Sequence, residues 1–114
     1  DRLKQVMLNL IGNAIQYTTP GGKVCIKLKQ IGDLAVFSVA DNGPGIAKED
    51  INHIFDRFFR GEKSRTRTRH AGFGLGLSIS QFIITQHKGE ISVESEAGRG
   101  TTFIVRLPLN RENQ

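Results

Sequence analysis

Apolar residues recur every three or four positions in three parts of the chain, and this spacing predicts three helices. The first covers residues 2–17, the second 48–56 and the third 75–87. The apolar face of the first consists of Leu3, Val6, Met7, Leu10, Ile11 and Ala14. The second turns Ile51, Ile54 and Phe55 inward, whereas the third is apolar on most of its surface.

Alternating apolar and polar residues predict four strands, over residues 23–30, 34–40, 90–95 and 101–107. The resulting order is α-β-β-α-loop-α-β-β. Because helices and strands come in separate groups, we predict an α+β fold. It is a two-layer α/β sandwich with three helices packed on a mixed, mainly antiparallel sheet. We expect residues 1–114 to form one domain, with a disordered tail over 109–114.

Composition excludes several classes of protein. The 114 residues are 38% hydrophobic and 24% charged, which is ordinary for a globular domain, and no apolar run approaches the ~20 residues of a membrane span. The single Cys25 excludes an intrachain disulfide. It lies in an apolar strand, so we predict that it packs in the core, and a reducing, cytoplasmic setting fits.

The net charge of +5 is concentrated in one segment. Residues 57–70 hold six of the 16 basic residues and one of the 11 acidic residues, so the rest of the chain is neutral. Such a segment suits a polyanion such as nucleotide phosphates, nucleic acid or an acidic membrane, although a solvated loop is an equally simple interpretation. No aromatic residues are interleaved with its basic residues from Lys63 to Arg69, which argues against nucleic acid.

Three polar residues form a stripe on the first predicted helix. Asn9, Asn13 and Tyr17 are four residues apart and run along the edge of the apolar face. Asparagine disfavours helix because its amide competes for backbone hydrogen bonds. The two amides are either solvated, or their oxygens face a cation or a phosphate-bound water.

The sequence "DNGPGI", residues 41–46, directly follows a predicted apolar strand. Gly43 and Gly45 leave the backbone open, and the Asp41 carboxylate could accept a hydrogen bond from an amino group such as that of adenine. A plain turn is the alternative, because Asp, Asn, Gly and Pro are all favoured in turns.

A third polar motif, "AGFGLGLS" at residues 71–78, places Gly72, Gly74 and Gly76 before a predicted helix, whose first amides would point at an anion. A Walker loop would need Lys followed by Ser or Thr, and a dinucleotide fingerprint would need a preceding strand. Neither is present.

Taken together, the motifs resemble the catalytic and ATP-binding domain of sensor histidine kinases, within the superfamily that includes DNA gyrase, the Hsp90 chaperone and MutL. "NLIGNAIQYT" is similar to the N box, "DNGPGIA" to the first glycine box and "IFDRFFRGEKSR" to the F box. "GFGLGLSI" is similar to the second glycine box and "GRGTTF" to the closing glycine motif. The resemblance implies a Bergerat (GHKL) fold that holds ATP between the helices and a lid over about 57–74.

The resemblance also implies roles for individual residues. Asn13 would coordinate Mg²⁺ with Asn9 beside it, and Tyr17 would pack near the nucleotide. Asp41 would bind the adenine amino group. The residues expected to shape the base pocket are Gly43, Gly45 and Ile46. Those expected to reach the phosphates are Arg60 and Arg65 from the lid, and Gly74, Leu75, Gly76 and Leu77 from the second glycine box.

The same resemblance favours a kinase over a hydrolase. Hydrolytic members carry Glu as a general base where this chain has Asn9, and a neutral amide cannot take a proton. We therefore expect transfer of the ATP γ-phosphate to a His on a separate helical dimerisation domain, with a response regulator downstream. The alternatives are an ATP hydrolase and a degenerate nucleotide-binding scaffold. Only the scaffold is supported by a residue, namely Gln16 in place of the usual Lys.

This resemblance sets the expected context. We expect a cytoplasmic, monomeric domain without membrane or nucleic-acid contact. We expect it to be excised from a longer kinase. A membrane-anchored sensor kinase is one possible parent protein.

Overall fold

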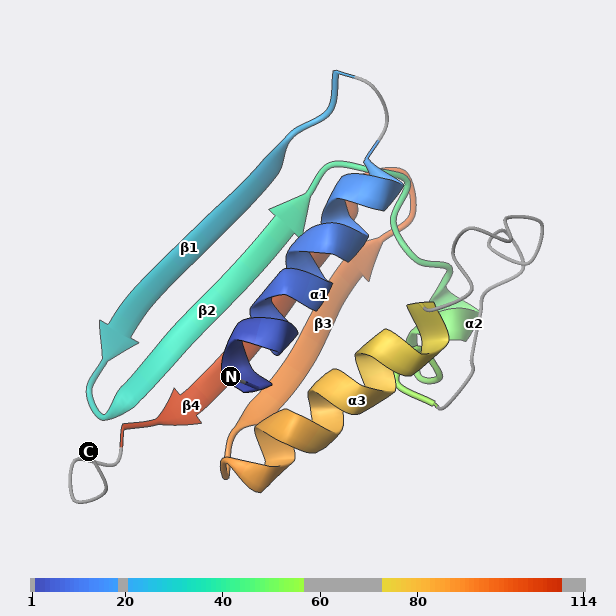
Figure 1. The fold of residues 1–114 in the computed structure, drawn as a ribbon. Coiled ribbons are helices and arrows are strands. Elements are labelled where there is room, and N and C mark those ends of the chain that lie inside the picture. The colour runs from blue at the N-terminus through green and yellow to red at the C-terminus, as the bar shows by residue number, and fades with distance from the viewer. Residues whose placement is uncertain (1, 19–20, 57–72, 110–114) are drawn as a thin grey trace.

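The computed structural model describes residues 2–18, 21–56 and 73–109, and shows three helices and four strands (Figure 1). The helices are α1 (Arg2–Tyr17), α2 (Lys48–Ile51) and α3 (Phe73–Gln86). The strands are β1 (Val24–Ile31), β2 (Leu34–Asp41), β3 (Glu90–Glu96) and β4 (Gly100–Pro108). Among the described residues, no helix is long and apolar enough to cross a membrane.

The four strands form one sheet in the order β1-β2-β4-β3. Each neighbouring pair in this order is antiparallel. β4 is therefore central although it comes last in the chain, and its start lies against the end of β2. The register places Asp41 opposite Val24 on one side and Thr101 on the other. This topology brings the loop after β2 to the turn between β3 and β4.

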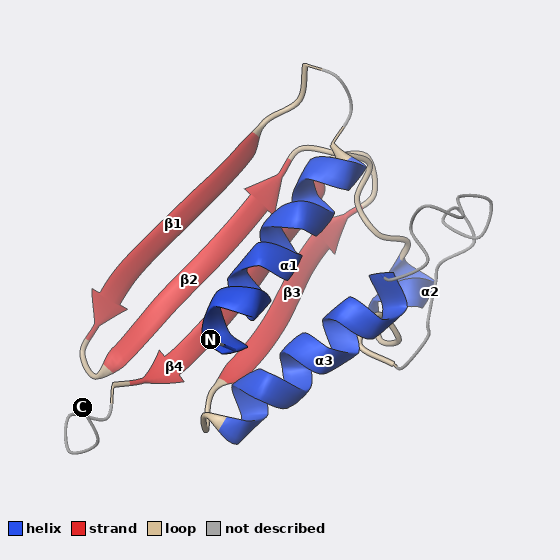
Figure 2. Cartoon of the chain, in the orientation of Figure 1, coloured by secondary structure: helices blue, strands red, loops and turns tan. Residues whose placement is uncertain are grey.

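The helices form a second layer on one face of the sheet (Figure 2). α1 lies over the middle strands, and α3 packs beside α1 and over β3. The core between the layers contains Val6, Leu10, Ala14, Phe37, Val39, Ile54, Leu77, Ile83, Ile84, Phe103 and Val105. The predicted α+β sandwich and the predicted apolar face of the first helix are confirmed.

β1 departs from its predicted role as a core strand. Cys25 is exposed, so the prediction that it packs in the core is wrong. Ile26 and Leu28 lie on the helix-side face, opposite the buried Val39 and Phe37, but they are 48% and 66% exposed. Cys25 is exposed because it pairs with Ala40 and points to the face of the sheet opposite the helices. Ile26 and Leu28 are exposed because β1 is the edge strand and lies beyond the cover of α1 (Figure 1). Alternation of polarity predicts the strand but not whether a helix covers it.

The second predicted helix is shorter than expected. α2 ends at Ile51, and the following hydrogen bonds join residues three apart, from His53 N to the Asp50 oxygen and from Asp56 N to the His53 oxygen, both 2.9 Å. Such bonds close tighter turns than those of an α-helix. Ile54 is still buried, and the Phe55 ring meets the Phe103 ring edge-on at 6.3 Å.

At the other end of the sheet, Leu109 donates its N–H to the Asp33 oxygen at 2.7 Å. The rest of the predicted tail lies outside the described residues.

Candidate functional site

Asp41 is the last residue of β2, and its carboxylate is half-buried on the helix-side face of the sheet. Its Oδ1 accepts a hydrogen bond from the Gly43 N–H at 2.9 Å. Burial raises the pKa of this carboxyl, while hydrogen bonds from the backbone of Gly43 and Thr101 act in the opposite direction. The structure therefore presents a partly desolvated hydrogen-bond acceptor at the end of β2.

The glycine loop, residues 42–47, is pressed against the turn between β3 and β4. Gly45 has φ 79°, and a Cβ there would collide with the carbonyl oxygen of Glu96. The Gly98 N–H donates to the Pro44 oxygen at 2.8 Å, and the Ile46 N–H donates to Ser95 Oγ at 2.7 Å. Only a glycine fits this approach of two backbones.

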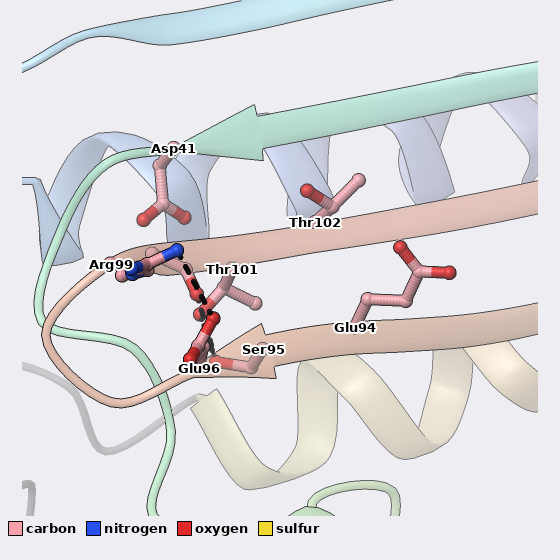
Figure 3. Close-up of a pocket in the computed structure, with 8 residues that line it drawn as sticks. Asp41, Glu94, Ser95, Glu96, Arg99, Thr101 and Thr102 are labelled. Atoms are coloured by element: carbon pink, nitrogen blue, oxygen red, sulfur yellow. Dashed lines mark hydrogen bonds and ion pairs between the residues drawn. The ribbon is translucent and has the colours of Figure 1, made fainter.

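The start of β4 closes the other side of Asp41. Gly100 has φ 129°, and a Cβ there would collide with the Asp41 carbonyl oxygen and lie 2.9 Å from Asn42 Cα. The next residue, Thr101, is buried and bonds Ser95 between the two hydroxyl oxygens at 2.8 Å. Figure 3 shows Asp41 and Thr101 next to each other at the ends of their strands.

Three residues of this site, Ser95, Gly100 and Thr101, have no role predicted from the sequence. The "GRGTTF" motif covers two of them. Ser95 could have been noticed from the alternation along β3. Ile91 and Val93 face the core, and Ser95 is the next residue on that face, where a hydroxyl needs a partner.

A cavity of about 300 Å³ adjoins this site. It is lined by Asp41, Glu94, Ser95, Glu96, Arg99, Gly100, Thr101 and Thr102 (Figure 3). Three carboxylates line it against a single arginine, which faces Glu96 at 3.8 Å. Like charges repel, so this cavity is unsuited to phosphate groups, and any phosphate site must lie elsewhere.

The asparagine stripe lies where α1 meets α3. Asn9 Nδ2 donates to the fully buried Ser80 Oγ at 3.3 Å. One turn later, Asn13 Nδ2 is buried and is the only such side-chain polar atom without a hydrogen bond among the described residues. Leaving such a group unpaired costs about 1–3 kcal/mol, so this Nδ2 atom is a candidate donor to a bound ligand.

Amide chemistry fits a magnesium–phosphate group at Asn13. The NH₂ can donate to a phosphate oxygen, and the amide oxygen is a ligand that Mg²⁺ accepts. Which end of the amide faces the site depends on the hydrogen-bond network, because the two ends have the same shape.

The remaining predicted site residues are placed only in part. The predicted lid up to residue 72, which includes Arg60 and Arg65, lies outside the described residues. The side chains of Tyr17 and of residues 73–76 also lie outside them. α3 begins at Phe73, two residues earlier than predicted, so Gly74 and Gly76 lie inside the helix and not before it. The first turn of a helix leaves N–H groups free, and it holds Gly74 and Leu75. Leu77 is fully buried and its side chain belongs to the core.

Comparisons with known proteins agree with this geometry. The family model "Histidine kinase-, DNA gyrase B-, and HSP90-like ATPase" matches residues 1–111. The sensor histidine kinase RppB of Synechocystis sp. is 45% identical over 108 residues, which cover 95% of this chain and 24% of that protein. The sensor protein SrrB of Staphylococcus aureus is likewise 45% identical, over 18% of its length. The chain thus spans a quarter or less of these relatives.

Solved structures show the same fold. The nucleotide-free catalytic domain of histidine kinase ThkA has a TM-score of 0.80 at 38% identity, over 99% of this chain and 70% of that one. Full-length ShkA in complex with AMPPNP has a TM-score of 0.79 at 34% identity, over 94% of this chain and 21% of that one. The chain therefore belongs to the histidine kinase-, DNA gyrase B- and HSP90-like ATPase family, as an ATP-binding catalytic domain of the sensor histidine kinase type.

Proposed function

We propose that this domain binds Mg-ATP and transfers its γ-phosphate to a histidine on a separate helical dimerisation domain of the parent kinase. The observation that carries the proposal is the buried Nδ2 atom of Asn13, which has no hydrogen-bond partner among the described residues and lies one helical turn from Asn9. A buried polar group is normally paired, so the site is built for a polar ligand.

The base of the nucleotide lies against Asp41 in this proposal. A half-buried carboxylate accepts a hydrogen bond from the adenine amino group more strongly than an exposed one, because less water competes for it. Gly43 is itself buried and keeps side chains out of the base pocket, as does the half-buried Gly45. Ile46 is partly buried against the core and offers an apolar contact for the ring.

The phosphates lie at the other end of the site, between α1 and the start of α3. Asn13 holds Mg²⁺ there with Asn9 beside it, and the metal supplies positive charge to the phosphate oxygens. Free N–H groups in the first turn of α3, around Gly74, Leu75 and Gly76, with the amide of Leu77 next to them, face the same anion. We assign Arg60 and Arg65 to the γ-phosphate, and Tyr17 to the side of the nucleotide.

Transfer, in preference to hydrolysis, follows from the chemistry of Asn9. Its amide is neutral and is engaged with Ser80, so it takes no proton from an attacking water. A neutral imidazole is already a nucleophile and needs no such base. The residues of this chain position the phosphate and balance its charge while the imidazole attacks.

We infer the wider context from the same assignment. A response regulator receives the phosphoryl group from the histidine. The domain acts as a monomer in the cytoplasm, without nucleic acid, and the parent kinase supplies any membrane anchor.

The proposal is tested by mixing this chain with a separate acceptor domain and γ-labelled Mg-ATP. Acid-labile label on the acceptor, strongly reduced with Asp41→Asn at the same ATP concentration, is the expected result. Steady phosphate release without an acceptor would indicate a hydrolase, and no nucleotide binding at all would indicate a scaffold. Either outcome contradicts the proposal.

A further inference from the structure

Four residues from four strands form one row across the sheet at the base end of the site. Val24, Asp41, Thr101 and Ser95 are paired in register from β1 through β2 and β4 to β3. Residues directly opposite each other in an antiparallel sheet project to the same face. Ser95 and Asp41 are therefore on the helix-side face, with the buried Thr101 between them.

Ser95 has a full set of hydrogen bonds. A serine hydroxyl donates one hydrogen bond and accepts two. Ser95 Oγ donates to the Gly100 carbonyl oxygen at 3.0 Å, because that oxygen can only accept. It accepts from the Ile46 N–H at 2.7 Å, which can only donate. The remaining bond, 2.8 Å to Thr101 Oγ1, must then be one in which Thr101 donates.

This pattern fixes the direction of the Thr101 hydroxyl. Its one proton is committed to Ser95, so the Thr101 hydroxyl has only lone pairs to offer other groups. The Asp41 carboxylate consequently receives a hydrogen bond from the Thr101 backbone but none from the Thr101 hydroxyl, and it stays an acceptor for a ligand. The same serine also ties Ile46 of the glycine loop to β3, across a sequence separation of 49 residues.

We propose that Ser95 is a positioning residue that makes the base pocket selective for a purine bearing an amino group at C6. It acts by holding Ile46 in place and by engaging the Thr101 hydroxyl proton, so that this hydroxyl does not compete with the ligand for Asp41. The inference rests on the proposed function, because it assumes that Asp41 meets the base. It extends that function by naming the residue that sets base selectivity without touching the ligand.

The chain offers a matched control in Ser92. Ser92 lies on the same strand but on the opposite face, where its Oγ accepts from Arg106 Nη1 at 3.2 Å. Ser92→Ala removes the same hydroxyl from the same strand and one side-chain hydrogen bond, away from the base pocket. It reports the general effect of the substitution on β3.

The test measures the affinities of this chain for Mg-ATP and for Mg-inosine triphosphate, whose base has a carbonyl in place of the amino group. Ser95→Ala should lower ATP affinity about tenfold and inosine triphosphate affinity much less, so that the ratio of the two falls severalfold. Ser92→Ala should leave both affinities within about twofold of wild type, and Ser95→Thr, which keeps the hydroxyl, should restore the ratio. An unchanged ratio in Ser95→Ala, or an equal loss in Ser92→Ala, would overturn the inference.

Two further measurements keep the test decisive. If Ser95→Ala does not fold, Ser95→Cys retains the size with a weaker hydrogen-bonding group and should shift the ratio in the same direction. Hydrogen exchange of the Ile46 amide should be faster in Ser95→Ala and Ser95→Cys, and unchanged in Ser95→Thr and Ser92→Ala; equal exchange rates in Ser95→Ala and wild type would overturn the inference. A wild-type chain that binds neither nucleotide would contradict the proposed function itself, and is thereby distinguished from a failure of the Ser95 role alone.

Discussion

The base end and the phosphate end of the site differ in how completely the protein satisfies its own polar groups. At the base end, Ser95 makes three hydrogen bonds, and the glycine loop is bonded to the β3–β4 turn. At the phosphate end, Asn13 Nδ2 is buried without a partner. The first arrangement is complete without a ligand, whereas the second is completed by one. The comparison indicates that the base end is preorganised before the ligand binds, whereas the polar groups of the phosphate end are paired only when Mg-ATP binds.

The largest effect is expected from filling the contact that closes the base end. Gly45→Ala places a Cβ into the Glu96 carbonyl oxygen at a φ of 79°, so we expect a loss of about 3 kcal/mol or more in the free energy of unfolding, and no ATP binding. Gly98→Ala is the control, since Gly98 has φ 84° but open space around it. It should cost only about 1–2 kcal/mol. Urea unfolding of both variants measures the difference, and equal losses would refute the role of the contact.

The next effect concerns ligand binding at the base end. Asp41→Asn replaces a carboxylate oxygen by an NH₂ that cannot accept from adenine. Because hydrogen bonds to charged groups contribute about 1.5–3 kcal/mol, we expect ATP affinity to fall about 10- to 100-fold. Calorimetric titration measures this, with the unfolding curve as a check on folding. Retained affinity would place the base elsewhere.

At the phosphate end, two asparagines should respond in opposite ways. Asn13→Ala removes an unpaired amide and introduces a better helix former, so the free energy of unfolding should stay level or rise by about 0.5–1 kcal/mol, while Mg-ATP affinity falls. Asn9→Ala breaks the bond to the buried Ser80 and should lower the free energy of unfolding by about 1 kcal/mol. Thermal and urea unfolding distinguish the two. A marked loss of stability in Asn13→Ala would show that its amide is paired within the protein.

The smallest effect is a pH dependence of stability at Asp41. Burial raises the pKa of this carboxyl in the folded chain above 3.8, so the folded state binds its proton more firmly than the unfolded state does. For this group the free energy of unfolding therefore falls as the pH rises from 3.8 through the folded pKa, and levels off above it. The difference between wild type and Asp41→Asn across this range isolates the contribution. If wild type instead became more stable relative to Asp41→Asn with rising pH, burial would not be the dominant influence on the pKa of Asp41.

The sequence predicted the fold and the position of Asp41 at the end of a strand because those features depend on local patterns. The apolar face of α1 follows from helical spacing, and Asp41 follows from an acid at the end of an apolar strand. Both are readable without knowing what packs against them. The assignments of Arg60 and Arg65 to phosphates stay predictions.

Other features depend on contacts between distant parts of the chain, which no local pattern encodes. Ile26 and Leu28 are exposed because α1 does not reach the edge strand, and no pattern within β1 indicates that. The exposure of Cys25 could have been predicted, because its alternation with Val24 and Ile26 places it on the face of the sheet opposite the helices. The role of Ser95 was not predicted because it depends on hydrogen bonds to Ile46 and Thr101. Only the folded chain places these residues next to Ser95. The short α2 similarly reflects tight turns that place Ile54 in the core.

The central claim is that a preformed base end is joined to a phosphate end that the ligand completes. Its most direct test follows the side-chain amide of Asn13 and the backbone amide of Ile46 by NMR during titration with adenosine and then with Mg-ATP. We predict that adenosine shifts the Ile46 signal and leaves Asn13 unchanged, whereas Mg-ATP shifts both and protects the Asn13 NH₂ from exchange. An Asn13 amide that does not respond to Mg-ATP would contradict the account.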